Sequence, residues 1–500
     1  MLGMDRREFL RCSLFASGVA ISAPRGFAEL SSTTSLRLTL DPEHTENTIA
    51  ADFTGLSYET AQLSDPRFFS GANSELIGLM RQLGTSGVLR IGGNTSAYCS
   101  WTPKAEGDAA SAADRDRAAP TILGSAVGPD TGKEPAAPRK ITRLAVRNLR
   151  DFVDAIGWQL IYGLNLGNET PEIAADEAAY VMDTIGSKLI AFQLCNEPDL
   201  FSRNGLRRPE YAFAQFAEEW QRFYEVIRPR VPHAPFAGPD TAFNNEWLVP
   251  FAQRFKQQVQ FLSQHYYAEG PPTDPSMTIE RLLRPNPKLD DEFAGMQRTK
   301  QESGLPFRMA ETNSCYQAGK QGVSDTFASA LWGAELMYQL AGAGGMGINF
   351  HGGGYGWYTP IAGTVQNGFV ARPIYYGLLL FAQVGPGRLI DARLDRPQEV
   401  PLLKAYALHS DTGAVKAVVF NKSQDRAVRL TIDPGKRAGQ ARILRLTAPR
   451  LDDTTDVTLG ASPVGANGAW ARAQEESLAL HDGKVTLDVL PASAVLVTFA

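Results

Sequence analysis

The sequence predicts an α/β protein in which an eight-stranded (β/α)8, or TIM, barrel is followed by a C-terminal β-sandwich domain. Between residues 51 and 382, eight short apolar runs alternate with stretches of helical periodicity, as in a parallel sheet covered on both faces. No glycine-rich phosphate loop follows the first run, which weighs against a nucleotide-binding fold. From residue 383 to residue 500, alternating runs follow one another without helices, which predicts a sandwich.

Eight apolar runs are the candidate barrel strands. They are Phe53–Ser57, Gly87–Ile91, Gln159–Tyr162, Leu189–Leu194, Pro235–Ala237, Val259–Ser263, Phe307–Ala310 and Met346–Phe350. Helical periodicity fills the segments between them, for example Ala145–Ile156, Glu172–Ile185, Tyr211–Ile227 and Asp325–Ala341. Eight such units favour a closed barrel over an open doubly wound sheet.

The sandwich is predicted from seven short runs split by turn residues. They are Leu402–Leu408, Ala414–Phe420, Ala427–Ile432, Ala441–Thr447, Asp456–Leu459, Lys484–Val489 and Ala494–Phe499. Residues 29–50 contain a similar run, Leu36–Leu40, so we expect this N-terminal strand to join the sandwich. Residues 102–138 are rich in Ala, Asp, Pro and Gly, and we expect a long loop there, inserted on the face where barrel active sites form.

Residues 1–28 are predicted to be a twin-arginine export signal. Arg6 and Arg7 precede a short, mildly apolar stretch, and the small residue Ala28 suits a cleavage site. The stretch is too short to span a bilayer, so we expect a periplasmic or secreted protein without stable membrane insertion after cleavage. The segment carries four arginines against two acidic residues, and its removal would change the formal net charge from −5 to −7.

An acidic chain of this kind is not expected to bind nucleic acid. Three cysteines lie beyond the signal, at Cys99, Cys195 and Cys315, and this odd, widely spaced set predicts no disulfide framework. The six histidines include no pair at metal-ligand spacing, so we predict no metal and no cofactor.

Two glutamates are the candidate catalytic residues. Glu197 follows the fourth apolar run and Glu311 follows the seventh, so each lies at the end of a buried barrel strand, where catalytic side chains of such barrels are found. A charge at such a position is unfavourable unless it has a partner or a function. Cleavage of a glycosidic bond with retention requires an acid/base and a nucleophilic carboxylate about 5 Å apart. A closed barrel can bring strands four and seven across its mouth.

The chain resembles glycoside hydrolase family 79, the β-glucuronidase and heparanase family, within a clan of retaining barrel glycosidases. Six segments carry the resemblance, in order, at successive strand ends. They are Gly55-Leu-Ser-Tyr-Glu59, Leu89-Arg-Ile-Gly-Gly-Asn94, Gln193-Leu-Cys-Asn-Glu-Pro198, Gln264-His-Tyr-Tyr267, Ala310-Glu-Thr-Asn-Ser-Cys-Tyr316 and His351-Gly-Gly-Gly-Tyr-Gly356. The resemblance covers nearly the whole chain after the signal.

The resemblance implies that Glu197 is the acid/base and Glu311 the nucleophile. It implies that Asn196 donates a hydrogen bond to the sugar 2-hydroxyl, and it adds Asn94 to the residues that bind the substrate. Arg90 is expected to brace the catalytic carboxylates.

The resemblance also implies roles for other polar residues at the mouth of the barrel. Tyr267 would donate a hydrogen bond to the nucleophile, with Tyr266 as the alternative, because the sequence does not fix which ring turns inward. Glu59 would accept hydrogen bonds from hydroxyls at the far end of the sugar ring.

A glucuronate substrate also presents a carboxylate at C6. In the family that the chain resembles, tyrosine hydroxyls and a backbone amide hold this group. Tyr316, together with Tyr355 and Gly356, fits that description here, and Tyr358 is the alternative to Tyr355 within the same loop. Glycine would let the backbone of residue 356 approach the ligand closely.

These residues predict an exo-acting β-glucuronidase whose substrate is a β-glucuronide glycan or glycoside. An endo-acting, heparanase-like enzyme is the nearest alternative, but it would need Lys/Arg clusters for sulfates. The barrel-mouth loops offer one modest cluster, Arg203, Arg207 and Arg208. A non-catalytic sugar-binding protein is the alternative from another class, and it predicts the loss of a glutamate that this chain retains.

Overall fold

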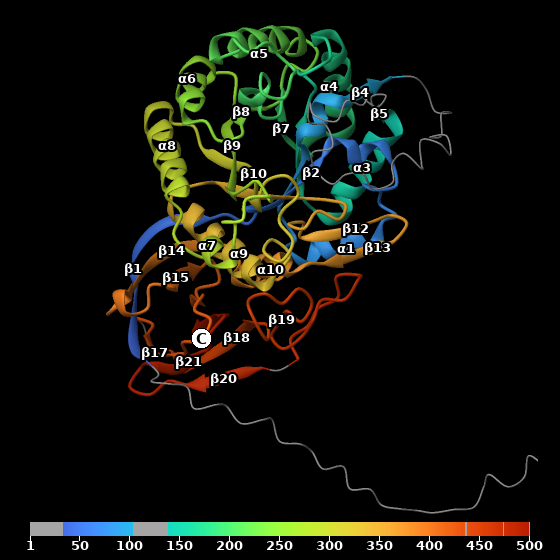
Figure 1. The fold of residues 1–500 in the computed structure, drawn as a ribbon. Coiled ribbons are helices and arrows are strands. Elements are labelled where there is room, and N and C mark those ends of the chain that lie inside the picture. Colours follow the sequence, from blue (N-terminus) through green and yellow to red (C-terminus); the bar gives the residue numbers. More distant parts are fainter. Residues whose placement is uncertain (1–33, 104–138, 436–437, 474, 500) are drawn as a thin grey trace, which may run out of the picture.

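The computed structural model describes residues 34–103, 139–435, 438–473 and 475–499 (Figure 1). The predicted export signal and nearly all of the predicted 102–138 insertion lie outside the described residues. Within the described part, no helix is both long and apolar enough to cross a membrane.

Eight parallel strands form a closed barrel, which confirms the predicted fold class. They are β2 (Thr54–Glu59), β3 (Val88–Gly92), β6 (Gln159–Gly163), β7 (Leu189–Gln193), β8 (Phe236–Thr241), β9 (Phe261–Glu269), β10 (Phe307–Cys315) and β11 (Gly347–Gly352). Each of the eight overlaps one of the predicted apolar runs, and the closing pair is β11 with β2. Since the strands are parallel, their carboxyl ends meet at one mouth, where a site can form.

Helices surround the barrel on its outer side (Figure 1). They are α1 (Ser74–Gln82), α3 (Arg143–Ile156), α4 (Pro171–Ile185), α5 (Phe213–Ile227), α6 (Asn245–Phe255), α7 (Ile279–Leu282), α8 (Pro287–Ser303), α9 (Phe327–Gly342) and α10 (Pro373–Val384). Local sequence explains where several of them begin. Thr142 caps the first turn of α3, and Thr170 caps α4, which also starts with a proline.

The β domain is one continuous sheet of ten strands. They are β1 (Thr34–Ile49), β14 (Gly387–Leu394), β15 (Leu403–Ser410), β16 (Val415–Asn421), β17 (Val428–Asp433), β18 (Gln440–Thr447), β19 (Thr458–Leu459), β20 (Glu476–Ala479), β21 (Val485–Val489) and β22 (Ser493–Phe499). The N-terminal strand β1 lies between β14 and β17. Two strand pairs lie outside both sheets: β4 (Cys99–Thr102) with β5 (Arg139–Thr142), and β12 (Ile361–Thr364) with β13 (Gly368–Ala371).

The two faces of this sheet pack against different partners. In β16, Ala417 and Val419 point into the core of the β domain, where they meet side chains from β1, β17 and β21. The alternate residues, Val418 and Phe420, belong to the large core that includes the barrel helices. Because successive side chains of a strand point to opposite faces, β16 is apolar on both faces and reads as a nearly unbroken apolar run.

Helices α9 and α10 lie between the barrel and the β domain (Figure 1). Both are buried on nearly every side, because one face covers the barrel strands and the other meets the sheet. Tyr338 of α9 stacks on Tyr406 of β15, with ring centroids 5.1 Å apart. A helix that is apolar all round is expected in such a position.

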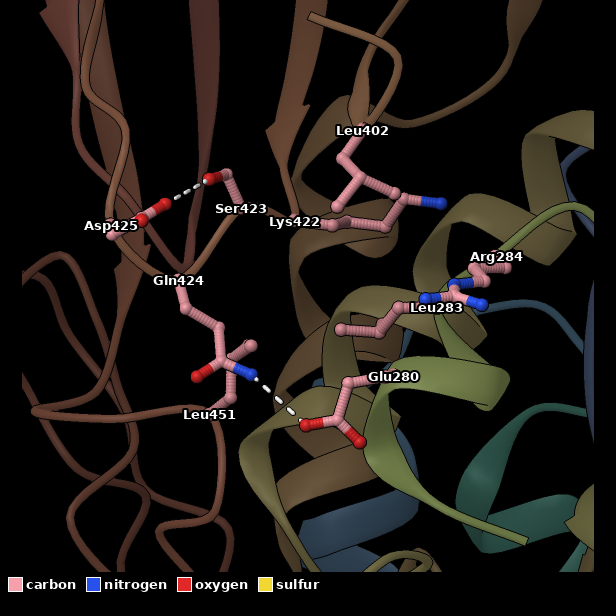
Figure 2. A pocket seen from close by; sticks show the side chains of 9 residues that line it. All are labelled: Glu280, Leu283, Arg284, Leu402, Lys422, Ser423, Gln424, Asp425 and Leu451. Atoms are coloured by element: carbon pink, nitrogen blue, oxygen red, sulfur yellow. Dashed lines mark hydrogen bonds between the residues drawn. The ribbon is translucent and has the colours of Figure 1, made fainter. Parts of the chain in front are cut away.

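A buried ion pair links α9 to the β domain at the edge of this contact. Lys422 Nζ lies 2.5 Å from a carboxylate oxygen of Glu335, and both side chains are at most 6% exposed. Figure 2 shows the neighbouring groove, in which Gln424 donates a hydrogen bond to Glu280 of α7 across the domain boundary. The groove has a volume of about 410 Å³, and polar side chains from both domains line it.

The Lys422–Glu335 pair generates a stability prediction. In the Glu335→Gln variant the ammonium of Lys422 stays buried without a counter-charge, so the free energy of unfolding should fall by about 3–5 kcal/mol. Urea denaturation measures this change. Arg429→Gln, which breaks an exposed pair with Asp488, is the matched control and should have a much smaller effect. Equal effects of the two variants would contradict the interpretation.

Candidate active site

The two glutamates meet at the mouth of the barrel. Glu197 lies in the loop after β7 and Glu311 lies in β10, and both side chains are buried. One carboxylate oxygen of Glu197 and one of Glu311 lie within 4.8 Å of each other. The backbone of Glu197 is left-handed, with φ of 48°, a conformation that non-glycine residues adopt infrequently and that often marks a functional position.

Strand β10 extends further than the apolar pattern predicted. The pattern ends at Ala310, whereas the strand continues to Cys315, with a register irregularity after Met309. Glu311 is therefore inside the strand rather than beyond it. The prediction ended the strand too early because it treated polarity as a sign of exposure, and residues 311–314 are polar yet fully enclosed.

Arg90 of β3 is the central cation of the site. Its guanidinium is completely buried, and it donates to Glu311 at 2.8 Å and to Asp240 at 2.6 Å. Three neutral acceptors complete its coordination: Ser57 Oγ, Gln193 Oε1 and Asn196 Oδ1, at 2.8–2.9 Å. A buried charge is tolerated when it is paired and fully hydrogen-bonded, and this arrangement fixes the position of Glu311.

Glu311 is held in its ionised form. Its second oxygen accepts a hydrogen bond of 2.7 Å from the hydroxyl of Tyr267. Burial alone would raise the pKa of this carboxyl. The positive charges of His351, His265 and Arg90, together with the Tyr267 hydroxyl, instead hold its pKa well below the ordinary value. An ionised, positioned carboxylate of this kind is suited to act as a nucleophile.

Tyr267, and not Tyr266, turns toward the nucleophile. The two residues are adjacent in β9, so their side chains point to opposite faces of the strand. Tyr266 is fully buried in the core outside the barrel, where Lys288 Nζ lies 5.5 Å from its ring centroid and its hydroxyl has no hydrogen-bond partner. Tyr266 therefore does not reach the site.

Glu197 is paired with a histidine. His265 Nδ1 lies 3.0 Å from Glu197 Oε1, and the other ring nitrogen, Nε2, lies 3.2 Å from Asp240 Oδ1. Burial disfavours the imidazolium, but the charges of Asp240 and Glu311 outweigh it and raise the pKa of His265 to about 10.

The consecutive glycines after Arg90 leave room for its side chain and for Glu59. A Cβ on Gly92 would lie 2.7 Å from the Arg90 guanidinium carbon, and one on Gly93, where φ is 73°, would collide with the carboxylate of Glu59. Glu59 accepts from the backbone and the hydroxyl of Thr95, at 2.8 and 2.5 Å.

Glu59 also connects to the catalytic pair through a histidine. Its other carboxylate oxygen lies 3.5 Å from His351 Nε2, while His351 Nδ1 lies 3.5 Å from Glu311. The contact with the sugar ring expected for Glu59 stays a prediction.

Asn196 and Asn94 lie side by side next to Arg90. Asn196 is buried, and its amide nitrogen donates to Asn94 Oδ1 at 3.2 Å. Asn94 is exposed at the mouth of the barrel. Since one hydrogen of the Asn196 amide is engaged by Asn94, the other is the one left for a ligand.

The tyrosines of the glycine-rich loop are arranged differently from the prediction. Tyr355 is 38% exposed, and its hydroxyl accepts a hydrogen bond from Asn367. Tyr358 instead faces the catalytic pair: it is 7% exposed, and its ring centroid lies 6.1 Å from that of Tyr267 and 6.0 Å from that of His351. Three consecutive glycines do not define which way the loop turns, so the sequence could not separate the two tyrosines.

Tyr316 and Gly356 are the other two residues expected to hold a C6 carboxylate. Tyr316 follows β10 and is partly buried, and its ring lies directly against Gly270. Gly356 is buried, and a Cβ there would meet the carbonyl oxygen of Ala318 at 3.4 Å. The expected contacts of Tyr316 and Gly356 with a C6 carboxylate stay predictions.

Three residues of the site had no role in the sequence analysis: Asp240, His265 and His351. The two histidines stand in segments that carried the family resemblance, and each occupies a barrel strand. Asp240 stands at the end of strand five of the barrel, a position that itself signals a functional residue. The predicted run, Pro235–Ala237, ends before Asp240, so the sequence pattern did not place Asp240 at the end of a strand.

In the described part of the chain, one group of side chains has the spacing of metal ligands: Glu197, His265 and Glu311. The guanidinium of Arg90 is bonded to Glu311 and lies 3.4 Å from His265 Nε2, so a cation there would meet an existing positive charge. The donor set therefore does not suit a metal, and the absence of a metal stays a prediction. Cys99, Cys195 and Cys315 are buried free thiols.

Two family models identify the family of this chain. Models of the N-terminal domain and the C-terminal beta domain of glycosyl hydrolase family 79 match residues 147–337 and 405–496. A β-glucuronidase of Aspergillus niger is 25% identical over 395 residues, which are 72% of this chain and 68% of that protein. A β-glucuronidase of Neurospora crassa is 22% identical over 440 residues, which are 77% of this chain and 74% of that protein.

Solved structures share the fold. A 4-O-α-L-rhamnosyl-β-D-glucuronidase from Fusarium oxysporum superposes with a TM-score of 0.72 at 17% identity, over 93% of this chain and 100% of that one. A family 51 arabinofuranosidase from Xanthomonas axonopodis pv. citri gives a TM-score of 0.67 at 14% identity, over 93% and 100% of the two chains. Together the two family models cover more than half of the sequence. The chain is therefore a member of glycoside hydrolase family 79.

Proposed function

We propose that this enzyme is a retaining exo-β-glucuronidase that removes terminal β-linked glucuronic acid by double displacement. The observation that carries the mechanism is the distance of at most 4.8 Å between oxygens of Glu197 and Glu311. Retaining enzymes place their carboxyl groups about 5–5.5 Å apart, whereas inverting enzymes leave roughly 6.5–9.5 Å for a water molecule. The named relatives supply the argument for glucuronate.

In the first step, Glu311 attacks the anomeric carbon and the glycosidic bond breaks. Glu197 gives its proton to the departing oxygen, so the leaving group is released as a neutral alcohol. Arg90 and Tyr267 hold the attacking carboxylate in position through the hydrogen bonds at 2.8 and 2.7 Å.

In the second step, Glu197 acts as a base. It takes a proton from water, the water oxygen bonds to the anomeric carbon, and the ester bond to Glu311 breaks. Both carboxyl groups return to their starting states. In each step the free amide hydrogen of Asn196 is directed to the sugar 2-hydroxyl, a contact that strengthens as positive charge develops on the ring.

Recognition of the C6 carboxylate is assigned to hydroxyl and backbone donors rather than to arginine. Tyr358 is buried beside Tyr267, which donates to the nucleophile, and Gly356 lies next to the Tyr358 ring. The role of Tyr316 follows from the family resemblance. Arg90 is unsuitable for this task, because it is completely buried and its donors are already bonded to protein acceptors. Tyr358 replaces Tyr355 in this proposal, because Tyr355 is 38% exposed whereas Tyr358 is buried beside Tyr267 and His351.

The basic cluster after β7, formed by Arg203, Arg207 and Arg208, favours exo action over endo action, because Arg207 is bonded within the protein. Arg207 donates to the backbone carbonyls of Leu166 and Gly167 and pairs with Glu219, so it is a structural residue and not a free sulfate ligand. Only Arg203 and Arg208 of the predicted cluster are exposed. Export to the periplasm or the exterior stays a prediction from the N-terminal sequence.

The substrate proposal is tested with aryl β-glucuronide, β-glucoside and β-xyloside of the same leaving group. We expect kcat/KM to be highest for the glucuronide, and NMR should show β-glucuronic acid as the first product, before mutarotation. Preference for a neutral sugar would contradict the substrate class, and the α-anomer as first product would contradict retention. Release of internal fragments from a polymeric substrate would contradict exo action.

Removal of the acid/base carboxyl should affect substrates unequally. In Glu197→Ala, hydrolysis of glucuronides with poor leaving groups should fall by about 10²–10⁴, because protonation of the leaving oxygen is lost. A dinitrophenyl glucuronide, which needs no proton, should still form the glycosyl-enzyme. Azide should then accelerate turnover and give the β-glycosyl azide. If the hydrolysis rate fell equally for substrates with good and poor leaving groups, the general acid would be another residue.

The Tyr267 hydrogen bond predicts a shift in the pH–rate profile. Glu311 must be ionised to attack, so activity is lost as pH falls through its pKa. In Tyr267→Phe the carboxylate loses a hydrogen bond, its pKa rises, and the acidic limb should move to higher pH by about one unit or more. Tyr266→Phe removes a hydroxyl on the opposite face and is the matched control. Coincident acidic limbs for the two variants would count against the assigned role.

A further inference from the structure

Asp240 occupies an unusual position at the end of β8. It is 1% exposed, and its backbone is left-handed with φ of 64°. Its backbone carbonyl accepts the N–H of Glu197 at 2.9 Å, so Asp240 also fixes the loop that carries the acid/base. A non-glycine residue keeps such a conformation when the surrounding structure imposes it, as often occurs at functional sites.

The carboxylate of Asp240 divides its two oxygens between the two catalytic residues. Oδ2 accepts from Arg90 at 2.6 Å, and Arg90 in turn donates to Glu311. Oδ1 lies 3.2 Å from His265 Nε2, and the other nitrogen of that ring lies 3.0 Å from Glu197. We call these contacts the Arg90 arm and the His265 arm.

We propose that Asp240 is the positioning residue that holds both catalytic carboxylates, Glu311 through the Arg90 arm and Glu197 through the His265 arm. It touches neither the substrate nor the reacting atoms. In the described part of the chain, Asp240 is the carboxylate that forms ion pairs with both Arg90 and His265, whereas Glu311 pairs with Arg90 and Glu197 with His265. The rate measurements below depend on the proposed hydrolytic function, whereas the contacts do not.

The His265 arm also favours the protonated form of the imidazole ring. A carboxylate can only accept, so Asp240 requires a hydrogen on Nε2. Because the pKa of His265 is raised to about 10, Nδ1 also carries a hydrogen near neutral pH and donates it to Glu197 Oε1. Without the Asp240 charge, the ring would lose both a charge that favours its protonated form and a contact that orients it.

The charges around His265 agree with this arrangement. Although burial opposes ionisation, Arg90 and His265 hold the pKa of Asp240 below its ordinary value, so it is a carboxylate across the neutral range. Titratable and charged groups face His265 from several elements: Arg90 of β3, Glu197 and Asp199 after β7, Asp240 of β8, Glu311 of β10 and Glu292 of α8. Among these charges, that of Asp240 contributes most to raising the pKa of His265.

The first test is the titration of His265 in Asp240→Asn, followed by NMR of isotopically labelled histidine. The chain has six histidines, and the signal of His265 is the one that is missing from the spectrum of His265→Gln. Removal of the nearby charge should lower the pKa of His265 by about one to three units. Glu177→Gln is the matched control, since it converts another buried carboxylate, bonded to Tyr162, into an amide. An unchanged titration in Asp240→Asn would overturn the proposal.

The second test compares phenyl and dinitrophenyl glucuronides. Loss of both arms in Asp240→Asn should lower kcat on both substrates, up to about 100-fold, and more on phenyl, since only that substrate needs the acid. His265→Gln breaks only one arm, so it should slow phenyl hydrolysis and largely spare dinitrophenyl hydrolysis. This variant carries the test if Asp240→Asn does not fold.

The outcomes separate this proposal from the proposed function. Equal losses on both substrates, with an unaltered pH profile, would mean a merely structural role and would overturn the positioning proposal. If the unmodified enzyme hydrolysed neither glucuronide, the proposed function would fail, while the His265 titration would still decide the role of Asp240.

Discussion

The buried guanidinium of Arg90 is the interaction on which the site depends. A fully enclosed cation is strongly unfavourable unless counter-charges and acceptors surround it, and here two carboxylates and three neutral acceptors do so. These acceptors come from strands and loops all around the barrel. The position of the catalytic pair therefore depends on the packing of β2, β3, β7, β8 and β10 around this charge.

The same network gives the two glutamates different surroundings. Glu311 is enclosed by Arg90, His351 and the Tyr267 hydroxyl, all of which favour its anion. Glu197 instead has His265 as its side-chain partner, with Nδ1 of the ring 3.0 Å from Oε1. Double displacement requires such a pair: Glu311 stays ionised and attacks, while Glu197 gives and takes a proton. The β domain supports this arrangement from outside, since α9 and α10 are buried between the sheet and the barrel.

The sequence predicted the frame of the fold because each barrel strand is a short apolar run between amphipathic segments. Glu197 and Glu311 could be chosen because they end the fourth and seventh runs. Prediction was weaker where the backbone departs from regular patterns. Asp240 lies beyond its predicted apolar run, which has only three residues, Pro235–Ala237. Tyr355 and Tyr358 follow consecutive glycines, whose backbone can turn in either direction. The polar interior of β10 also concealed the true end of that strand, because burial there depends on hydrogen bonds that no local pattern reveals.

The central claim, that Glu311 becomes covalently bonded to the sugar, can be tested by trapping. A 2-fluoro glucuronide with an activated leaving group slows the second step more than the first, so the glycosyl-enzyme should accumulate. Mass spectrometry of the digested protein should then find one sugar adduct, on the peptide that contains Glu311, and none in Glu311→Gln. An adduct on Glu197, or turnover without any adduct, would contradict the double-displacement account.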